Sequence, residues 1–78
     1  MKTFMVVERF RPGRMDAVYE RFAAKGRLLT AGLEYIESWR APDAEICFQL
    51  MRAEDAARFE PWFAHWADLV EFELHKIR

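Results

Sequence analysis

The sequence predicts an α+β domain whose elements follow the order β-α-β-β-α-β. Apolar residues alternate with period two in four short runs and recur at three- and four-residue steps in two longer ones, which distinguishes strands from helices. Turn-forming residues separate these runs. The chain has 78 residues and is 53% hydrophobic, which supplies one core, so we expect residues 1–78 to form a single domain.

The first half begins with a strand and continues with a helix. Residues 3–10 alternate between two faces and are rich in β-branched and aromatic types. The Pro12-Gly13 pair ends this strand. From residue 14 to residue 29 the apolar residues return every three or four positions, which predicts an amphipathic helix.

A hairpin is predicted in the middle of the chain. Residues 33–40 and 45–51 each alternate between two faces, and the turn at 41–44 contains the Pro-Asp pair that favours a chain reversal. Two strands joined by so short a turn pair antiparallel. The sequence therefore predicts that these strands are neighbours in the sheet.

A second helix and a last strand complete the domain. Asp55 is expected to cap the helix by accepting hydrogen bonds from the free amides of its first turn. Pro61 lies too far from this cap to belong to the first turn, so we expect a kink or a restart of the helix there. Residues 69–77 alternate again and form the fourth strand.

This order is the split β-α-β arrangement of ferredoxin-like folds, with a four-stranded antiparallel sheet and two helices on one face. We expect the helices to cover the drier strand residues, which are Ile36, Ile46, Phe48, Leu50, Val70, Phe72 and Leu74. The other face is expected to carry Phe4, Val6, Phe10, Tyr35, Trp39, Met51 and Leu69. So many large apolar residues should not stand in water, and a face-to-face homodimer, a dimeric α+β barrel, would cover them.

Polar residues also alternate along the strands, and we expect them on this second face. They are Glu8, Glu37, Gln49, Glu71, Glu73 and His75. In a cleft closed by the dimer partner, Glu8, Glu37 and Gln49 would set the polarity around a small molecule. Tyr35 and Trp39 would form its apolar walls. Glu8 or Glu37 could act as a catalytic base, because a carboxylate near another carboxylate in a water-poor cleft has a raised pKa. The alternative is pairing of these carboxylates with arginines across the dimer.

Other chemical sites are less strongly indicated. Glu71, Glu73 and His75 could offer metal ligands, but neighbouring positions on one face of a strand lie about 7 Å apart, so further ligands would be required. We therefore predict no metal and no cofactor. Cys47 is predicted to be a small packing residue, because no partner base is apparent in the sequence. His65 is expected on the surface.

Composition excludes several functional classes. The chain has 12 Lys and Arg and 13 Asp and Glu, and no basic stripe with interleaved aromatics, so nucleic acid is not an expected partner. No apolar run is long enough to span a membrane, and the N-terminal residues contain no signal-peptide core. The single cysteine forms no internal disulfide, which favours a cytoplasmic location.

Several segments in order along the chain carry a resemblance to a known family. They are Glu8-Arg9-Phe10, Lys25-Gly26-Arg27, Ser38-Trp39, Cys47-Phe48-Gln49-Leu50-Met51 and Asp68-Leu69-Val70-Glu71-Phe72-Glu73. The chain resembles the bacterial family catalogued as domain of unknown function 3303, which is related in shape to dimeric α+β barrels. The resemblance implies a ferredoxin-like homodimer and transfers no activity. Arg52 and the His75-Lys76 tail depart from the family pattern.

Three functions follow as hypotheses. The first is a homodimer that binds a small, partly aromatic or cationic molecule in the cleft. The second is a cofactor-independent enzyme of the monooxygenase or isomerase type. The third is a structural dimer whose polar residues form an internal hydrogen-bond network. A cavity with an isolated carboxyl would favour the second hypothesis, and fully paired polar groups without a cavity would favour the third.

Overall fold

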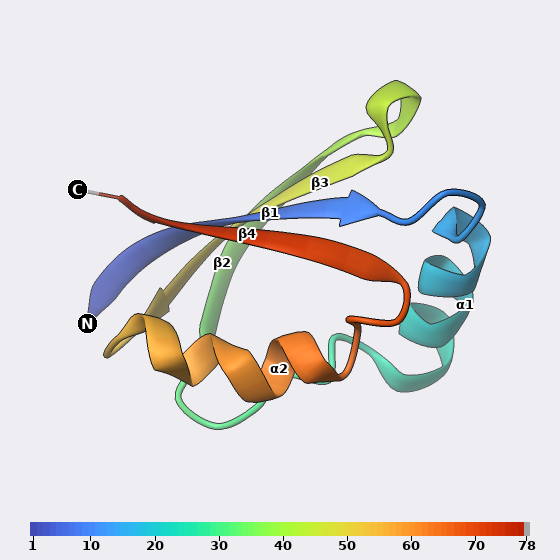
Figure 1. The fold of residues 1–78 in the computed structure, drawn as a ribbon. Coiled ribbons are helices and arrows are strands. Elements are labelled where there is room, and N and C mark those ends of the chain that lie inside the picture. Colours follow the sequence, from blue (N-terminus) through green and yellow to red (C-terminus); the bar gives the residue numbers. More distant parts are fainter. Residues whose placement is uncertain (78) are drawn as a thin grey trace.

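The computed structural model describes residues 1–77, apart from the side chain of Pro42. Four strands form one antiparallel sheet in the order β2-β3-β1-β4 (Figure 1). Their bounds are β1 Lys2–Phe10, β2 Glu34–Ala41, β3 Ile46–Ala53 and β4 Val70–Ile77. The α+β class, the element order and the antiparallel hairpin of β2 and β3 are confirmed.

Apart from a short turn at the tip of the β2–β3 hairpin, the helical elements lie below the sheet and beside one of its ends (Figure 1). Their bounds are α1 Met15–Lys25, the 3₁₀ turns η1 Pro42–Ala44 and η2 Ala56–Phe59, and α2 Glu60–Ala64. The segment formed by η2 and α2 runs beneath the strands, whereas α1 stands next to the end at which β1 leaves the sheet. The two segments therefore border a space below the sheet from different directions.

Glycine and proline set the helix ends. Helix α1 ends before Gly26, whose φ of 69° is in the left-handed region, so the helix is shorter than the predicted 14–29. Pro61 lies in the first turn of α2, where its missing N–H leaves no hydrogen bond unmade, and the predicted restart of the helix is confirmed. Asp55 makes no side-chain capping bond, so its predicted role was wrong.

The face that the helices cover differs from the prediction. Val70 and Phe72 of β4 lie opposite Phe10 and Glu8 of β1, and directly opposed residues point to the same side of a sheet. We call this the helix-facing side and the other the open side. The buried core belongs mainly to the helix-facing side and consists of Phe4, Val6, Phe10, Val18, Met51, Ala53, Phe59, Trp62, Trp66, Leu69 and Val70.

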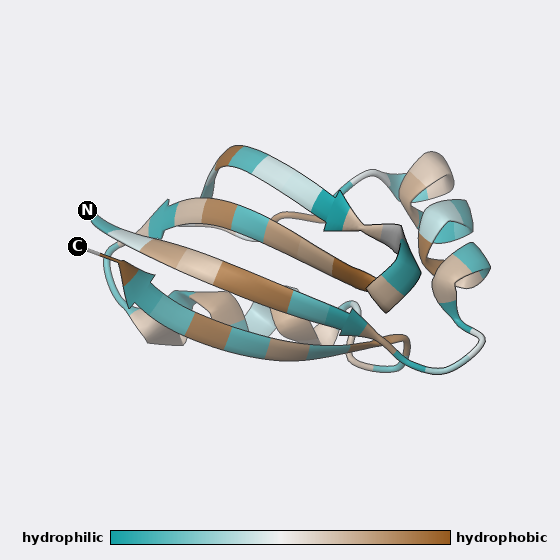
Figure 2. Ribbon diagram, turned by 90° about the horizontal axis from the view of Figure 1, so that it is seen from above, coloured by the Kyte–Doolittle hydropathy of each residue, from teal (hydrophilic) through white to brown (hydrophobic). Residues whose placement is uncertain are grey.

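The assignment of β1 and β3 to the faces was therefore inverted. Phe48 and Leu50 pair with Val7 and Met5 on the open side, together with Ile46, although all three were expected under the helices. Val70, Phe72 and Leu74 do lie under the helices, as predicted. In Figure 2, apolar and polar bands alternate along β4, the strand whose two faces were predicted correctly.

A β-bulge in β2 explains the remaining difference. Tyr35 lies opposite Met51, but Glu37 lies opposite Leu50, so one extra residue interrupts the alternation. Beyond the bulge, Ser38 and Arg40 occupy the helix-facing side. The Tyr35 hydroxyl and the Ser38 Oγ are 2.7 Å apart, in agreement with their shared side. Glu37 and Trp39 are consequently turned to the open side.

Candidate functional site

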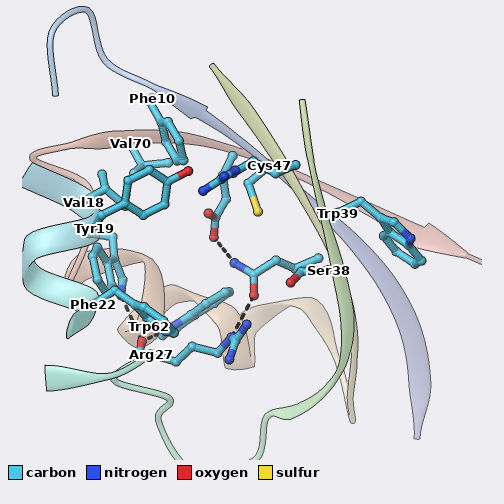
Figure 3. Close-up of a pocket in the computed structure, with 14 residues that line it drawn as sticks. Phe10, Val18, Tyr19, Phe22, Arg27, Ser38, Trp39, Cys47, Trp62 and Val70 are labelled. Atoms are coloured by element: carbon cyan, nitrogen blue, oxygen red, sulfur yellow. Dashed lines mark hydrogen bonds between the residues drawn. The ribbon is translucent and has the colours of Figure 1, made fainter. Parts of the chain in front are cut away.

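A cavity of about 300 Å³ lies between α1, the α2 segment and the helix-facing side of the sheet (Figure 3). Its lining combines aromatic rings with a few polar groups. The lining residues are Glu8, Phe10, Val18, Tyr19, Phe22, Arg27, Ser38, Trp39, Arg40, Cys47, Gln49, Trp62, Trp66 and Val70. They come from all four strands, both helical segments, the loop after α1 and the turn before β4.

Cross-strand register places the polar lining residues. Arg40 lies opposite Cys47, and Cys47 lies opposite Glu8, which forms one row across β2, β3 and β1. Ser38 and Gln49 form the next row on the same side. Strand pairing thus brings together residues that are more than thirty positions apart in the sequence.

Glu8, Gln49 and Arg27 form a hydrogen-bonded chain in the cavity. The Gln49 side-chain amide donates to Oε2 of Glu8, and Arg27 Nε donates to Oε1 of Gln49 over 3.3 Å. Glu8 and Gln49 are the buried polar residues of the core, with exposed fractions of 8% and 6%. One carboxylate oxygen of Glu8, Oε1, accepts no hydrogen bond from the described residues and is available to a ligand.

Two tryptophans hold Arg27 in place. The indole Nε1 groups of Trp62 and Trp66 both donate to the main-chain oxygen of Arg27, at 2.9 and 3.0 Å. The Arg27 guanidinium lies over the Tyr35 ring, 3.6 Å from its centroid. The loop after α1 is therefore fixed to the α2 segment by its backbone and to β2 and β3 by its side chain.

The carboxyl of Glu8 has a raised pKa that lies close to neutral pH. Burial raises its pKa from 4.5 to about 7, and this effect outweighs the hydrogen bond from Gln49 and the charge of Arg27, both of which lower the pKa. Near neutral pH both protonation states are populated. Glu8 can therefore donate or accept a proton, which suits general acid or base chemistry.

Cys47 lies beside Glu8 but is not an activated nucleophile. Burial, followed by the charge of Glu8, raises the pKa of its thiol to about 11. The thiol is therefore protonated at neutral pH, and the thiolate is the nucleophilic form. Its contact with the core agrees with the packing role that the sequence predicted.

The five predicted ligand-binding residues do not share one surface. Glu8, Tyr35 and Gln49 lie on the helix-facing side, and Glu37 and Trp39 lie on the open side because of the bulge. Trp39 borders the cavity, but Figure 3 shows its side chain on the far side of the strands, pointing away. The expected location between the sheet and a dimer partner is thus wrong for Glu8, Tyr35 and Gln49, which lie on the helix-facing side.

Sequence reasoning missed several lining residues. The predicted ligand-binding residues did not include Tyr19, Phe22, Trp62 and Arg40, all of which line the cavity. The apolar stripe of α1 was visible in the sequence, but nothing there indicated that it faces a cavity. Arg27 was also absent from the predicted set, and its side chain donates a hydrogen bond to Gln49.

The polar residues of β4 form surface ion pairs on the open side. Arg9 bonds to Glu73 at 2.7 Å, and His75 lies 3.4 Å from the same carboxylate. Arg11 is 3.9 Å from Glu71. Within residues 1–77 no group of three or more potential ligands is arranged to hold a metal ion. In the same part of the chain, no helix has the length and apolar character needed to cross a membrane.

The fold and this cavity define an α+β sheet domain with a pocket of ligand size. The family model described as "Domain of unknown function (DUF3303)" matches residues 2–76, so the chain belongs to that family. Comparison with curated proteins gave no significant match, and neither did comparison with solved structures.

Proposed function

We propose that this protein binds a small, planar organic molecule in the cavity between the helices and the sheet. The observation that carries the proposal is the buried Glu8–Gln49 pair within an otherwise largely aromatic cavity. Pockets that bind small molecules combine apolar walls with a few placed polar groups, and their volumes begin at roughly 300 Å³. The cavity agrees with both features.

The walls favour a flat ligand. Trp62 and Trp66 present fixed rings, because their indole nitrogens are held by the Arg27 carbonyl. Phe22 is 42% exposed beside the cavity, so a ligand that covers it would bury apolar surface. An aromatic ligand would also gain from stacked or edge-on contacts with these rings.

The indole N–H resonances of Trp62 and Trp66 in a proton–nitrogen NMR spectrum test the proposal. A set of small aromatic acids, amides and amines is added to the protein, and the affinity is read from resonance shifts. The Trp39 indole serves as an internal control, since its side chain points away from the cavity. We expect the Trp62 and Trp66 signals to shift with saturation. No shift with any compound at millimolar concentration would contradict the proposal.

A second candidate function is acid–base catalysis on the bound molecule, with Glu8 as the proton carrier. The pKa of about 7 favours it, since a group that titrates near the working pH transfers protons efficiently in both directions. This corresponds to the isomerase-type hypothesis, in which Glu8 removes a proton from carbon and returns it elsewhere. Glu37 is less suited to this role because it lies on the open side.

Hydrogen exchange into bound compounds distinguishes binding from catalysis. Each compound that shifts the indole signals is incubated with protein in heavy water, and loss of its acidic C–H signals is followed. A catalyst that uses Glu8 exchanges them, and Glu8→Gln abolishes the exchange while the compound still binds. Binding without exchange for every compound would reject the catalytic candidate and leave the binding proposal intact.

We also propose that the protein is a homodimer that pairs through the open side of its sheet. Trp39 and Ile77 on this side are 47% and 38% exposed, although both are large and apolar. Phe48 lies opposite Trp39, and Val7 lies opposite Phe48, so these three apolar residues form one row across the open side. Exposed apolar surface of this kind marks an interaction site, and a small domain gains stability by association.

The dimer and the cavity are separate parts of this proposal, because they lie on opposite sides of the sheet. If the dimer forms but the cavity binds nothing, the protein is the structural dimer that was the third hypothesis. A cytoplasmic location is also part of the proposal. Its support is the unpaired Cys47, which suits a reducing compartment.

A further inference from the structure

One end of the cavity carries a cation and a hydroxyl whose hydrogen-bonding groups are unused. The Arg40 guanidinium lies over the Tyr19 ring, 4.8 Å from its centroid. Across the described residues, 1–77, Arg40 takes part in no ion pair and donates no side-chain hydrogen bond. An arginine has five N–H donors in a planar fork, which matches a carboxylate.

The Tyr19 hydroxyl is buried and has no hydrogen-bond partner among the same residues. Figure 3 shows its oxygen pointing into the cavity rather than into the core. A buried hydroxyl without a partner is costly, at roughly 1–3 kcal/mol in proteins, and usually indicates a missing water or ligand. Tyr19 and Arg40 therefore present unused donors to the same space.

The balance of charge in the cavity favours an anion. Arg27 and Arg40 are both cationic, and Glu8 is the acidic residue of the lining. Burial favours its uncharged form, so the two arginines are not fully compensated. Cys47 adds no charge, since its thiol is protonated at neutral pH. The cavity thus carries a net positive charge. This disfavours the cationic ligand that the sequence-based hypothesis allowed.

We propose that the ligand is a planar monoanionic acid whose carboxylate is bound by Arg40 and the Tyr19 hydroxyl and whose ring lies toward Trp62 and Trp66. This inference rests on the proposed binding function and specifies its ligand class. Arg40 is exposed and can receive a solvated carboxylate at the mouth of the cavity. The two tryptophans are 1% and 6% exposed, so they form the inner wall.

Binding of this acid is linked to the protonation of Glu8. An anion in the cavity disfavours a second negative charge nearby, so the complex holds the Glu8 proton more tightly than the free protein does. The charged and titratable groups that face Glu8 from the surrounding elements are Tyr19 of α1, Arg27 of the following loop, Arg40 of β2 and Cys47 of β3. Affinity for the anion should fall as the pH rises above about 7.

The test compares cinnamate, cinnamamide and cinnamylammonium, which share a planar frame and differ in charge. Affinities are measured from the Trp62 and Trp66 indole resonances, with Trp39 as the internal control. We expect cinnamate to bind about tenfold or more tightly than either of the others, because a charge-assisted hydrogen bond is worth about that factor. We also expect its affinity to be several-fold weaker at about pH 8 than at about pH 6, with this dependence lost in Glu8→Gln.

Two variants locate the carboxylate. Arg40→Gln should lower the affinity for cinnamate about tenfold and change the affinity for cinnamamide by no more than about twofold. Arg14→Gln removes the same charge from an exposed position outside the lining and should leave cinnamate binding unchanged. The dispersion of the indole signals verifies that each variant is folded.

The outcomes separate this inference from the function on which it rests. If the amide or the ammonium compound binds as tightly as cinnamate, the proposal of an anionic ligand is wrong, but the proposal that the cavity binds small molecules is unaffected. If Arg40→Gln and Arg14→Gln lower the affinity for cinnamate equally, the carboxylate of cinnamate is not bound by Arg40. If none of the three compounds shifts the indole resonances of Trp62 or Trp66 but other planar molecules do, the proposed ligand class is wrong and the proposed binding function remains. If no compound of any charge shifts them, the proposed function fails as well.

Discussion

The side-chain amide of Gln49 donates a hydrogen bond to Oε2 of Glu8 inside the cavity between the helices and the sheet. The two residues lie on neighbouring strands, β3 and β1, and both are buried. Gln49 in turn accepts a hydrogen bond from Arg27. This orientation leaves Gln49 able to stabilise the ionised form of Glu8, although burial has the larger effect on its pKa. Four predictions follow from this arrangement and from the two sides of the sheet.

The stability of the free protein should depend on pH through Glu8. Its pKa is raised from 4.5 to about 7 on folding, so the folded state binds the proton more tightly than the unfolded state. The resulting stabilisation is fully present below about pH 4.5 and is lost as the pH rises through about 7, a change of about 3 kcal/mol. Denaturant unfolding across this range measures it. Glu8→Gln should remove most of this dependence, and Glu54→Gln, at an exposed position, should retain it. Equal pH profiles for the two variants would refute the assignment to Glu8.

Gln49→Leu should destabilise the protein more at high pH than at low pH. The substitution removes the hydrogen bond that favours ionised Glu8 and leaves a buried carboxylate without that donor. We expect a loss of about 1–3 kcal/mol at about pH 8 and a smaller loss at about pH 5, where Glu8 is protonated. The same substitution in a Glu8→Gln background provides the control, since its cost should no longer vary with pH. A cost that is independent of pH in both backgrounds would mean that Gln49 does not act on the charge of Glu8.

Trp62 and Trp66 should show non-additive effects, because both donate to one carbonyl oxygen, that of Arg27. Trp62→Phe or Trp66→Phe alone leaves that oxygen one partner, whereas the double variant leaves it none from these two side chains. We expect each hydrogen bond to contribute about 1 kcal/mol and the double variant to lose more than the two single losses combined. Denaturant unfolding measures the three values. Trp39→Phe is the control for loss of an indole that makes no such bond, and strict additivity would show that the shared oxygen is not stabilising.

Trp39→Glu should dissociate the proposed dimer without unfolding the monomer. Trp39 is 47% exposed on the open side, so a carboxylate there is hydrated in the monomer and would be buried in the interface. Sedimentation should show a dimer for the native chain and a shift of at least about tenfold in its dissociation constant for the variant. Leu29→Glu places the same charge at a 39% exposed apolar residue outside the sheet and should remain dimeric. A native chain that is monomeric at micromolar concentration would refute the interface.

The elements and their order were predictable because each depends on local spacing. The strand at Val70–Ile77 and the restart at Pro61 follow from alternation and from the missing proline N–H. The faces were not predictable in the same way. The apolar and polar residues on the two sides of β1 differ too little in composition to show which side the helices cover, and only pairing with β4 decides it.

The candidate site was predictable only in part. Glu8 and Gln49 stood out as polar residues within apolar strands, and they do form its polar centre. Glu37 and Trp39 lie on the open side, as expected, but they are separated from Glu8, Tyr35 and Gln49. One extra residue in β2 reverses the alternation after Tyr35, and no glycine or proline marks this bulge in the sequence. Tyr19 and Arg40 could not be associated at all, since only the packing of α1 against the sheet brings them together.

The central claim is that Glu8 is a buried, proton-exchanging carboxyl inside a ligand cavity. An NMR titration of its isotope-labelled carboxyl carbon, with and without saturating cinnamate, tests this most directly. The account predicts a midpoint of about 7 in the free protein and a higher midpoint in the complex. A midpoint near 4.5 that cinnamate does not move would contradict it, because Glu8 would then be a solvated carboxylate with no ligand site around it.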